Sequence, residues 1–274
     1  MADAPPRIAF QGEPGAFSEE ATRALFGADV DALPHPTFRA VFEAVTQGRV
    51  DGGVVPVENA IAGPVVDNLD LLIEFQPPLS GEWVLRVRHC LLAPPGRALA
   101  DIERVLSHPQ ALAQCAGYLR GKGLHPVPES NTAAAAKRVA EELPPRTAAI
   151  ASLAAARRYG LTVLDEGIED SADNATRFLA LGRARPPNVG TRRKTTVCVS
   201  VADTARGLSE VLAAFASRNL TVTGLFPRPG GGAWRPVWLM DVEAAEDSPR
   251  LLAALEDARA ASTTLRVLGG YATG

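Results

Sequence analysis

Short apolar runs alternate with polar loops and amphipathic stretches from residue 7 to residue 181. Phe38, Val41, Phe42 and Val45 repeat with helical spacing, which predicts a helix over 38–47. Ser18 is the expected N-cap of an earlier helix, with acidic residues in its first turn. In chain order the pattern predicts strands at 8–10, 53–57, 105–106, around 127, 148–151, 161–164 and 178–181, helices ending near 26, 47, 75, 119, 143 and 159, and an apolar stretch at 83–93.

The alternation of strand and helix begins near residue 7 and begins again near residue 105, which predicts two α/β lobes with a cleft between them. Polar stretches at strand-to-helix junctions occupy 11–18, 58–63, 107–114 and 130–132. Free backbone N–H groups at such junctions favour anions. We therefore expect a substrate that carries carboxylates.

The segment 183–193 has no periodicity and is rich in Pro, Gly and Arg, so we place a domain boundary there, between residues 1–185 and 194–274. The elements beyond it are a strand at 195–201, a helix at 205–218, strands at 220–226 and 237–242, a helix at 249–260 and a strand at 264–268. This βαββαβ order is ferredoxin-like. Small domains of this shape often pair sheet edges, so a homodimer or homotetramer is expected.

The 274 residues carry a net charge of -3, which gives no sign of nucleic acid or anionic lipid as a partner. Cys90, Cys115 and Cys198 are widely spaced in apolar surroundings, which indicates buried, reduced thiols. No leader pattern begins the chain, and no apolar run approaches the roughly 18 residues of a membrane span. A cytoplasmic protein is expected.

Thr176 and Arg177 stand side by side where a polar loop gives way to the apolar run 178–181. In open α/β folds ligands bind where loops meet strand ends, and a hydroxyl beside a guanidinium can donate a proton or hydrogen bond next to a bound anion. The alternative is an ordinary salt bridge at a strand edge.

Four stretches together resemble prephenate dehydratase with a C-terminal ACT domain. They are Gly-Glu-Pro-Gly-Ala-Phe-Ser-Glu at 12–19, Pro-Val-Glu-Asn at 56–59 with Gly63 and Leu-Asp-Leu-Leu at 69–72, Ser-His-Pro-Gln-Ala-Leu-Ala-Gln-Cys at 107–115, and Asn-Ala-Thr-Arg-Phe at 174–178. Parts of the sequence are also similar to the arogenate dehydratases of the same family. The resemblance implies a two-lobed catalytic domain like that of periplasmic binding proteins, followed by a ferredoxin-like ACT domain.

The family's reaction removes the ring hydroxyl and a carboxylate of prephenate as water and CO2 and leaves phenylpyruvate, with no metal or organic cofactor. By resemblance, Thr176 donates to the leaving oxygen, Arg177 holds a substrate carboxylate and Asn59 donates to the substrate. Glu58 either orients its neighbours or takes part directly. The substrate-lining positions that match are Ser18, Ser107, Gln114, Asn131, Thr132 and Phe178, the last expected chiefly to pack.

His108 has two interpretations: a polar contact near substrate, or a helix cap beside Pro109. His35, His89 and His125 show no metal spacing and are expected to be structural or exposed. Departures from the family include Ala60 and Asn68, each where a hydroxyl is usual.

The ACT region departs further at its effector positions, which would be Gly207, Leu208, Thr221 and Arg228. Phe226 and Pro227 stand where polar atoms usually meet an amino-acid effector, and Arg206 replaces a glycine. Regulation by Phe or another aromatic amino acid therefore stays open. Two other functions also stay open: arogenate dehydratase, and a sensor that binds an anion or amino acid without catalysis.

Overall fold

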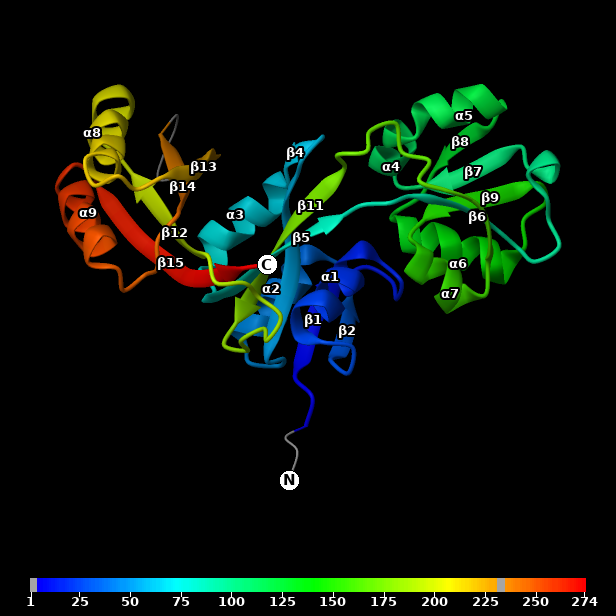
Figure 1. Ribbon diagram of the computed structural model, residues 1–274, viewed down its shortest axis with the longest axis horizontal. Coiled ribbons are helices and arrows are strands. Elements are labelled where there is room, and N and C mark those ends of the chain that lie inside the picture. Colours follow the sequence, from blue (N-terminus) through cyan, green and yellow to red (C-terminus); the bar gives the residue numbers. More distant parts are fainter. Residues whose placement is uncertain (1–3, 231–234) are drawn as a thin grey trace.

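A computed structural model describes residues 4–230 and 235–274 and divides them into two α/β lobes and a C-terminal βαββαβ unit (Figure 1). The first lobe lies in the centre of the view, between the other two parts. The mixed α/β fold class with its two-lobed N-terminal part is confirmed, and so is the βαββαβ order.

The first lobe is built on the sheet order β5-β11-β3-β1-β2. Its strand β3 is almost continuously buried, as its apolar sequence predicts. Thr37 caps α2 by accepting a hydrogen bond from the Ala40 amide. The elements are β1 (Arg7–Gln11), α1 (Phe17–Phe26), β2 (Asp31–His35), α2 (Phe38–Thr46), β3 (Gly52–Asn59), β4 (Gly63–Pro64), α3 (Val66–Phe75), β5 (Leu79–Arg86) and, much later in the chain, β11 (Ala175–Gly182).

The second lobe has its own five-stranded sheet, in the order β10-β6-β9-β7-β8. Residues 87–89 and 167–174 connect the two lobes. The elements are β6 (Cys90–Ala93), η1 (Leu99–Asp101), β7 (Arg104–Ser107), α4 (Pro109–Gln114), α5 (Ala116–Lys122), β8 (His125–Pro128), α6 (Thr132–Glu142), β9 (Thr147–Ala151), α7 (Leu153–Tyr159) and β10 (Thr162–Glu166).

The C-terminal unit continues the sheet of the first lobe. Its strands run in the order β13-β14-β12-β15, and the end of β15 pairs in parallel with β5, at Ala272 with Gly81 and Thr273 with Glu82. An apolar cluster spans this junction, with Leu79 and Leu179 on one side and Leu239 and Tyr271 on the other. The elements are β12 (Arg193–Ser200), α8 (Thr204–Ala216), β13 (Val222–Pro229), β14 (Pro236–Val242), α9 (Pro249–Ala260) and β15 (Thr264–Thr273).

Several predicted elements differ in detail. The apolar stretch 83–93 divides into β5 and β6, which belong to different sheets, and the helix expected over 109–119 is interrupted at Cys115. Helix α1 begins at Phe17 with Ala16 as its N-cap, so the prediction that Ser18 caps this helix is wrong. Strand β2 was not predicted, because its sequence Asp-Ala-Leu-Pro-His has little alternation and contains a proline.

All three cysteines are buried and unpaired, as predicted. Among the helices of residues 4–230 and 235–274, none combines the length and apolar character needed to cross a bilayer.

Candidate active site

A cavity of about 360 Å³ lies between the two lobes. The loop from β1 to α1, the end of β3 and the start of β11 line it from the first lobe, and one side of α4 and the start of α6 line it from the second. His89, from the connection between β5 and β6, completes the wall. The polar lining side chains are Gln11, Ser18, Asn59, His89, His108, Gln110, Gln114, Ser130, Asn131, Thr132 and Thr176.

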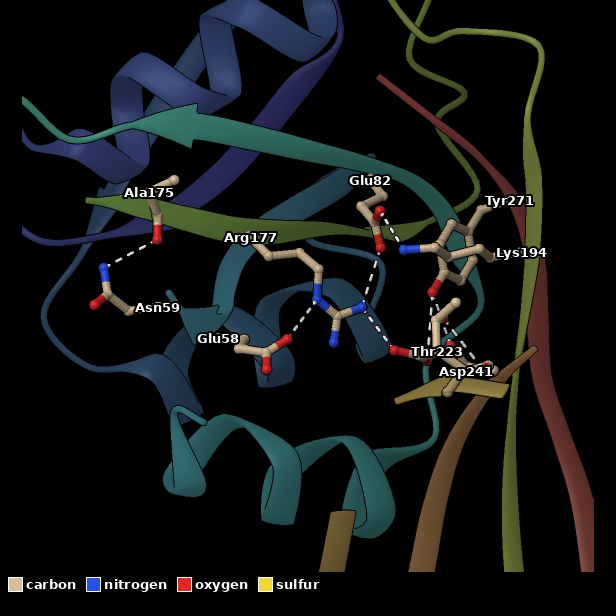
Figure 2. A network of polar contacts seen from close by, with 10 residues as sticks. Glu58, Asn59, Glu82, Ala175, Arg177, Lys194, Thr223, Asp241 and Tyr271 are labelled. Atoms are coloured by element: carbon tan, nitrogen blue, oxygen red, sulfur yellow. Dashed lines mark hydrogen bonds and ion pairs between the residues drawn. The ribbon is translucent and has the colours of Figure 1, made fainter. Parts of the chain in front are cut away.

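Thr176 faces the cavity because β11 pairs with β3, with Thr176 opposite Asn59. The Asn59 Nδ2 group donates to Thr176 Oγ1 at 3.0 Å, to Asn174 Oδ1 at 2.9 Å and to the Ala175 carbonyl at 3.1 Å, the last of which Figure 2 shows. The hydroxyl oxygen therefore accepts a bond, while its own hydrogen is available for a group in the cavity. A bond accepted by a hydroxyl oxygen strengthens the bond that this hydroxyl donates.

Gln114 connects this arrangement to the second lobe. Its Nε2 group lies 3.4 Å from Asn59 Oδ1, and its Oε1 accepts from Asn174 Nδ2 at 3.1 Å. The Oε1 atom also lies 3.0 Å from His89 Nε2. This orientation of the amide presents an oxygen to the imidazole, which assigns the proton to His89 Nε2 as the donor of the hydrogen bond.

His89 is 2% exposed, and burial lowers the pKa of its imidazole. The ring is therefore neutral near pH 7, and its Nδ1 atom is buried without a hydrogen-bond partner among the described residues. The edge of the ring meets Phe17, with centroids 5.5 Å apart. No sequence pattern marks this histidine as a site residue, because it stands alone between two strands.

Among the cavity-lining residues that the structure describes, none is Asp, Glu, Lys or Arg. Positive potential comes instead from helix N-termini. Ala16 caps α1 without a side-chain hydrogen bond, and it lines the cavity with Phe17 and Ser18. Asn131 caps α6 by accepting from the Ala134 amide at 2.7 Å, and Ser130 to Thr132 also line the cavity. Two helix N-termini thus border one space, an arrangement that favours bound carboxylates.

The structure brings together most of the residues predicted from the sequence. Asn59, Ser18, Gln114, Asn131, Thr132 and Phe178 all line the cavity with Thr176. Phe178 is also 2% exposed and packs in the core, as expected. His108 caps α4 by accepting from the Gln110 amide at 3.2 Å, which is the cap interpretation. It lines the cavity as well, and a polar contact with substrate stays a prediction.

The structure places three of the predicted residues away from the cavity. Arg177 lies outside the cavity lining and makes ion pairs with Glu58, Glu82 and Asp241, so its guanidinium is not free for a substrate carboxylate. Its partner Glu58 also lies outside the lining. Both residues stand one position beyond the Thr176–Asn59 pair, and neighbouring strand residues face opposite sides of a sheet. Ser107 is fully buried and donates to the Ile150 carbonyl at 2.7 Å, so it packs inside the second lobe instead of lining the cavity.

The predicted effector residues lie in the C-terminal unit. Gly207 is buried on α8, where an added Cβ would lie 2.8 Å from Val201 Cβ, and Leu208 follows it. Thr221 is exposed before β13. Arg228 pairs with Asp70 of α3 through two bonds of 2.7 and 2.9 Å, so its side chain is occupied in this structure.

Two α/β lobes around a cavity lined by both polar and apolar side chains, followed by a βαββαβ unit, define a two-lobed ligand-binding class of protein with an appended small domain. Within that class, the family model of prephenate dehydratase matches residues 8–186. The chain belongs to the prephenate dehydratase family.

Similar proteins cover nearly the whole chain. Arogenate dehydratase 2 of Petunia hybrida is 40% identical over 97% of this chain and 71% of its own length. A prephenate dehydratase from Arthrobacter aurescens, solved in complex with L-Phe, is 32% identical with a TM-score of 0.88, over 97% of this chain and 89% of that one. A structure described as a novel type of quorum-quenching acylase is 37% identical with a TM-score of 0.87, over 97% and 98% of the two chains.

Proposed function

We propose that this protein is a prephenate dehydratase, a lyase that converts prephenate to phenylpyruvate, water and CO2. The observation that carries the proposal is the Thr176 hydroxyl, oriented by Asn59 at the wall of an interlobe cavity that carboxylates can enter. The family to which the chain belongs supports this reaction class.

In the proposed reaction the bond between the ring carbon and its hydroxyl oxygen breaks as the bond to the ring carboxylate breaks. The electron pair of the second bond enters the ring, which becomes aromatic, and the carboxylate leaves as CO2. The departing hydroxide takes a proton and leaves as water. Aromatisation makes the step strongly downhill, so the protein needs only to orient the substrate and assist the leaving oxygen, and no cofactor is required.

Thr176 is the residue that we assign to the leaving oxygen. A threonine hydroxyl is a weak acid, so its role is to donate a hydrogen bond that becomes a proton transfer as negative charge develops, and the threonine regains a proton from solvent before the next turnover. Preorganisation makes such a donor effective, because no reorientation is needed in the transition state. Asn59 provides that preorganisation by its bond to Oγ1.

The two substrate carboxylates are assigned to the N-termini of α1 and α6, beside Ser18 and Thr132. This assignment replaces the predicted contact with Arg177, whose charge is already neutralised by carboxylates. Gln114 would fix the distance between the lobes around the substrate through its bonds to Asn59 and His89.

Arogenate is the alternative substrate, and the Petunia relative carries that activity in its name. Arogenate has an ammonium group where prephenate has a ketone. No acidic side chain lines the described cavity to pair with an ammonium group, which favours prephenate. Since one contact can decide such selectivity, the ratio of kcat/KM for the two substrates is the deciding measurement.

We do not propose acylase activity on the basis of the similarity to the acylase structure. Amide hydrolysis by a hydroxyl nucleophile requires an adjacent general base. In the described part of the chain Thr176 Oγ1 is bonded to the amide of Asn59 and to no histidine. A dehydratase therefore fits the site better.

The C-terminal unit, residues 194–274, is proposed to be an ACT domain that binds an aromatic amino acid, with the catalytic domain over 1–185. The complex of the Arthrobacter relative with L-Phe supports an effector of this kind. Titration of the active enzyme with Phe, Tyr and Trp tests it. The edge strand β13 supports a homodimer or homotetramer through sheet pairing.

The experiment that tests the main proposal is incubation of the purified protein with prephenate while the absorbance of phenylpyruvate is followed. Catalytic formation of phenylpyruvate is expected. Tight binding of prephenate without product would contradict the proposal and favour a non-catalytic sensor.

A further inference from the structure

Arg177 lies at the junction of the first lobe and the C-terminal unit, with its guanidinium among three carboxylates (Figure 2). Its Nη1 atom lies 2.7 Å from Asp241 Oδ2 and 3.0 Å from Glu82 Oε2. The exposed fractions of these side chains are 12% for Arg177, 7% for Asp241 and 3% for Glu82. Burial lowers the pKa of the guanidinium, but Asp241 and the other acidic groups around it raise that pKa above its ordinary value, so the group stays charged.

The C-terminal unit holds the partners of Arg177 in place. Thr196 of β12 donates to Asp241 Oδ1 at 2.6 Å and also meets the Tyr271 hydroxyl at 2.9 Å. Lys194 of β12 lies 2.8 Å from the second oxygen of Glu82. Asp241 and Glu82 are therefore fixed by β12 and β15 rather than by the catalytic lobe alone.

Arg177 is also the neighbour of the proposed hydrogen-bond donor. On paired strands β3 and β11, Thr176 is opposite Asn59 and Arg177 is opposite Glu58. The first pair faces the cavity, while the second faces the C-terminal unit. Only the thickness of one sheet separates the Asp241–Arg177 ion pair from the Asn59–Thr176 hydrogen bond.

The pairing of β11 with β3 is irregular at this point. Its register shifts between Arg177 and Phe178, and such a bulge disrupts the local ladder of hydrogen bonds. Glu58 lies 3.3 Å from Arg177 Nε, yet this nitrogen has no hydrogen bond in the described structure. The first residues of β11 pair with β5 and β3, and Arg177 adds a bond to Glu82 of the same lobe and one to Asp241 of the C-terminal unit.

We infer that Arg177 is a positioning residue through which the C-terminal unit holds Thr176 and Asn59 in the arrangement required for catalysis. This inference rests on the proposed dehydratase function. A change in the C-terminal unit that displaces β14 would move Asp241 and, through its ion pair with Arg177, alter the positions of Thr176 and Asn59.

The test compares two variants that each remove one charge from an ion pair between the same two units. Asp241→Asn keeps the size of the side chain and a partner for Thr196 but removes the charge facing Arg177. Asp70→Asn is the matched control, because it weakens the equally short Arg228–Asp70 pair between β13 and α3 without touching β11.

For Asp241→Asn we expect kcat with prephenate to fall by about 10- to 100-fold with KM within about twofold, because misplacement of a catalytic group by about 1 Å can cost about 100-fold. Amide hydrogen exchange at residues 175–177 should become faster in the same variant. Asp70→Asn should change neither quantity. Arg177→Lys, which keeps the charge but not the geometry, should retain more kcat than Arg177→Gln.

A fall in thermal stability of Asp241→Asn with kcat and β11 exchange unchanged would overturn the inference, as would equal effects of the two charge-removing variants. If Asp241→Asn does not fold, the Arg177→Lys and Arg177→Gln pair decides by the same two measurements. If the wild-type protein forms no phenylpyruvate, the proposed function fails, while the exchange measurement still tests the link between the units.

Discussion

Thr176 depends for its proposed role on a neighbour across the strand pair and not on its own acidity. The two hydrogens of Asn59 Nδ2 are shared among three acceptors, on Asn174, Ala175 and Thr176, and the last of these contacts fixes the hydroxyl oxygen. An isolated strand threonine would rotate among its rotamers and meet water. The pairing of β3 with β11 is what makes this hydroxyl different from others on the molecule.

Replacing Thr176 with Ala should lower kcat by about 10²- to 10⁴-fold, the usual contribution of positioned proton donors. KM should change little, because the carboxylates bind elsewhere. Steady-state kinetics with prephenate measure both quantities. Thr176→Ser, which keeps the hydroxyl, is the control and should retain most of the activity; an unchanged kcat in the alanine variant would remove the assigned role.

His89 should make stability depend on pH. Its folded-state pKa is lowered from 6.5 by burial, so the unfolded chain binds more protons below that value, and the free energy of unfolding falls as pH decreases. In His89→Gln this contribution is absent. Denaturant unfolding at several values between pH 5 and pH 8 should show a smaller loss of stability on acidification for the variant than for the wild type. His108 is present in both proteins, so its own contribution cancels in the comparison.

At the scale of elements, the loop from β1 to α1 connects the lobes as well as lining the cavity. Ser152 of the second lobe donates to the Gly15 carbonyl at 2.7 Å, and the Tyr159 hydroxyl donates to the Pro14 carbonyl at 2.8 Å. Gly15 has φ +90°, and an added Cβ would lie 2.8 Å from Ala155 Cα. The glycine is needed both for its backbone conformation and for this close approach.

Gly15→Ala should therefore destabilise the protein by about 1–3 kcal/mol through overpacking and raise KM, because the loop carries the N-terminus of α1. Gly27→Ala is the matched control, since Gly27 has a similar φ of +96° but open space around it. Equilibrium unfolding and steady-state kinetics of the two variants separate the two effects. Both substitutions introduce backbone strain, but only Gly15→Ala disturbs the contact between the lobes. Equal changes in KM would contradict the proposed role of the loop.

At the scale of the whole molecule, the C-terminal unit shares a sheet and an apolar cluster with the first lobe. Each unit therefore buries a surface that it would expose alone. This continuity also explains how residues more than sixty positions apart, such as Arg177 and Asp241, meet in one buried ion pair.

Leu239 is 2% exposed in that shared cluster, so Leu239→Ala should cost about 2–5 kcal/mol. We expect the first lobe and the C-terminal unit to unfold together in this variant as in the wild type. Scanning calorimetry shows whether the two parts unfold in one transition. The fluorescence of Trp83, isolated by replacing the other tryptophans, reports the unfolding of the first lobe. Leu252→Ala, at a half-exposed site, should leave the transition unchanged; separate transitions for the two parts would contradict the expectation.

The sequence by itself determined most elements, the two-lobed arrangement and much of the cavity wall, because hydrophobic period, caps and glycine-bearing turns are local. Thr176, Asn59, Gln114 and Asn131 belong to stretches whose order along the chain already indicated a shared site. Tertiary structure alone decided which face of each strand meets the cavity. A period of two places neighbours such as Thr176 and Arg177 on opposite faces, but packing of the second lobe and the C-terminal unit decides what each face meets. The C-terminal unit binds Arg177 through Asp241, while the second lobe buries Ser107 and brings Gln114 to His89.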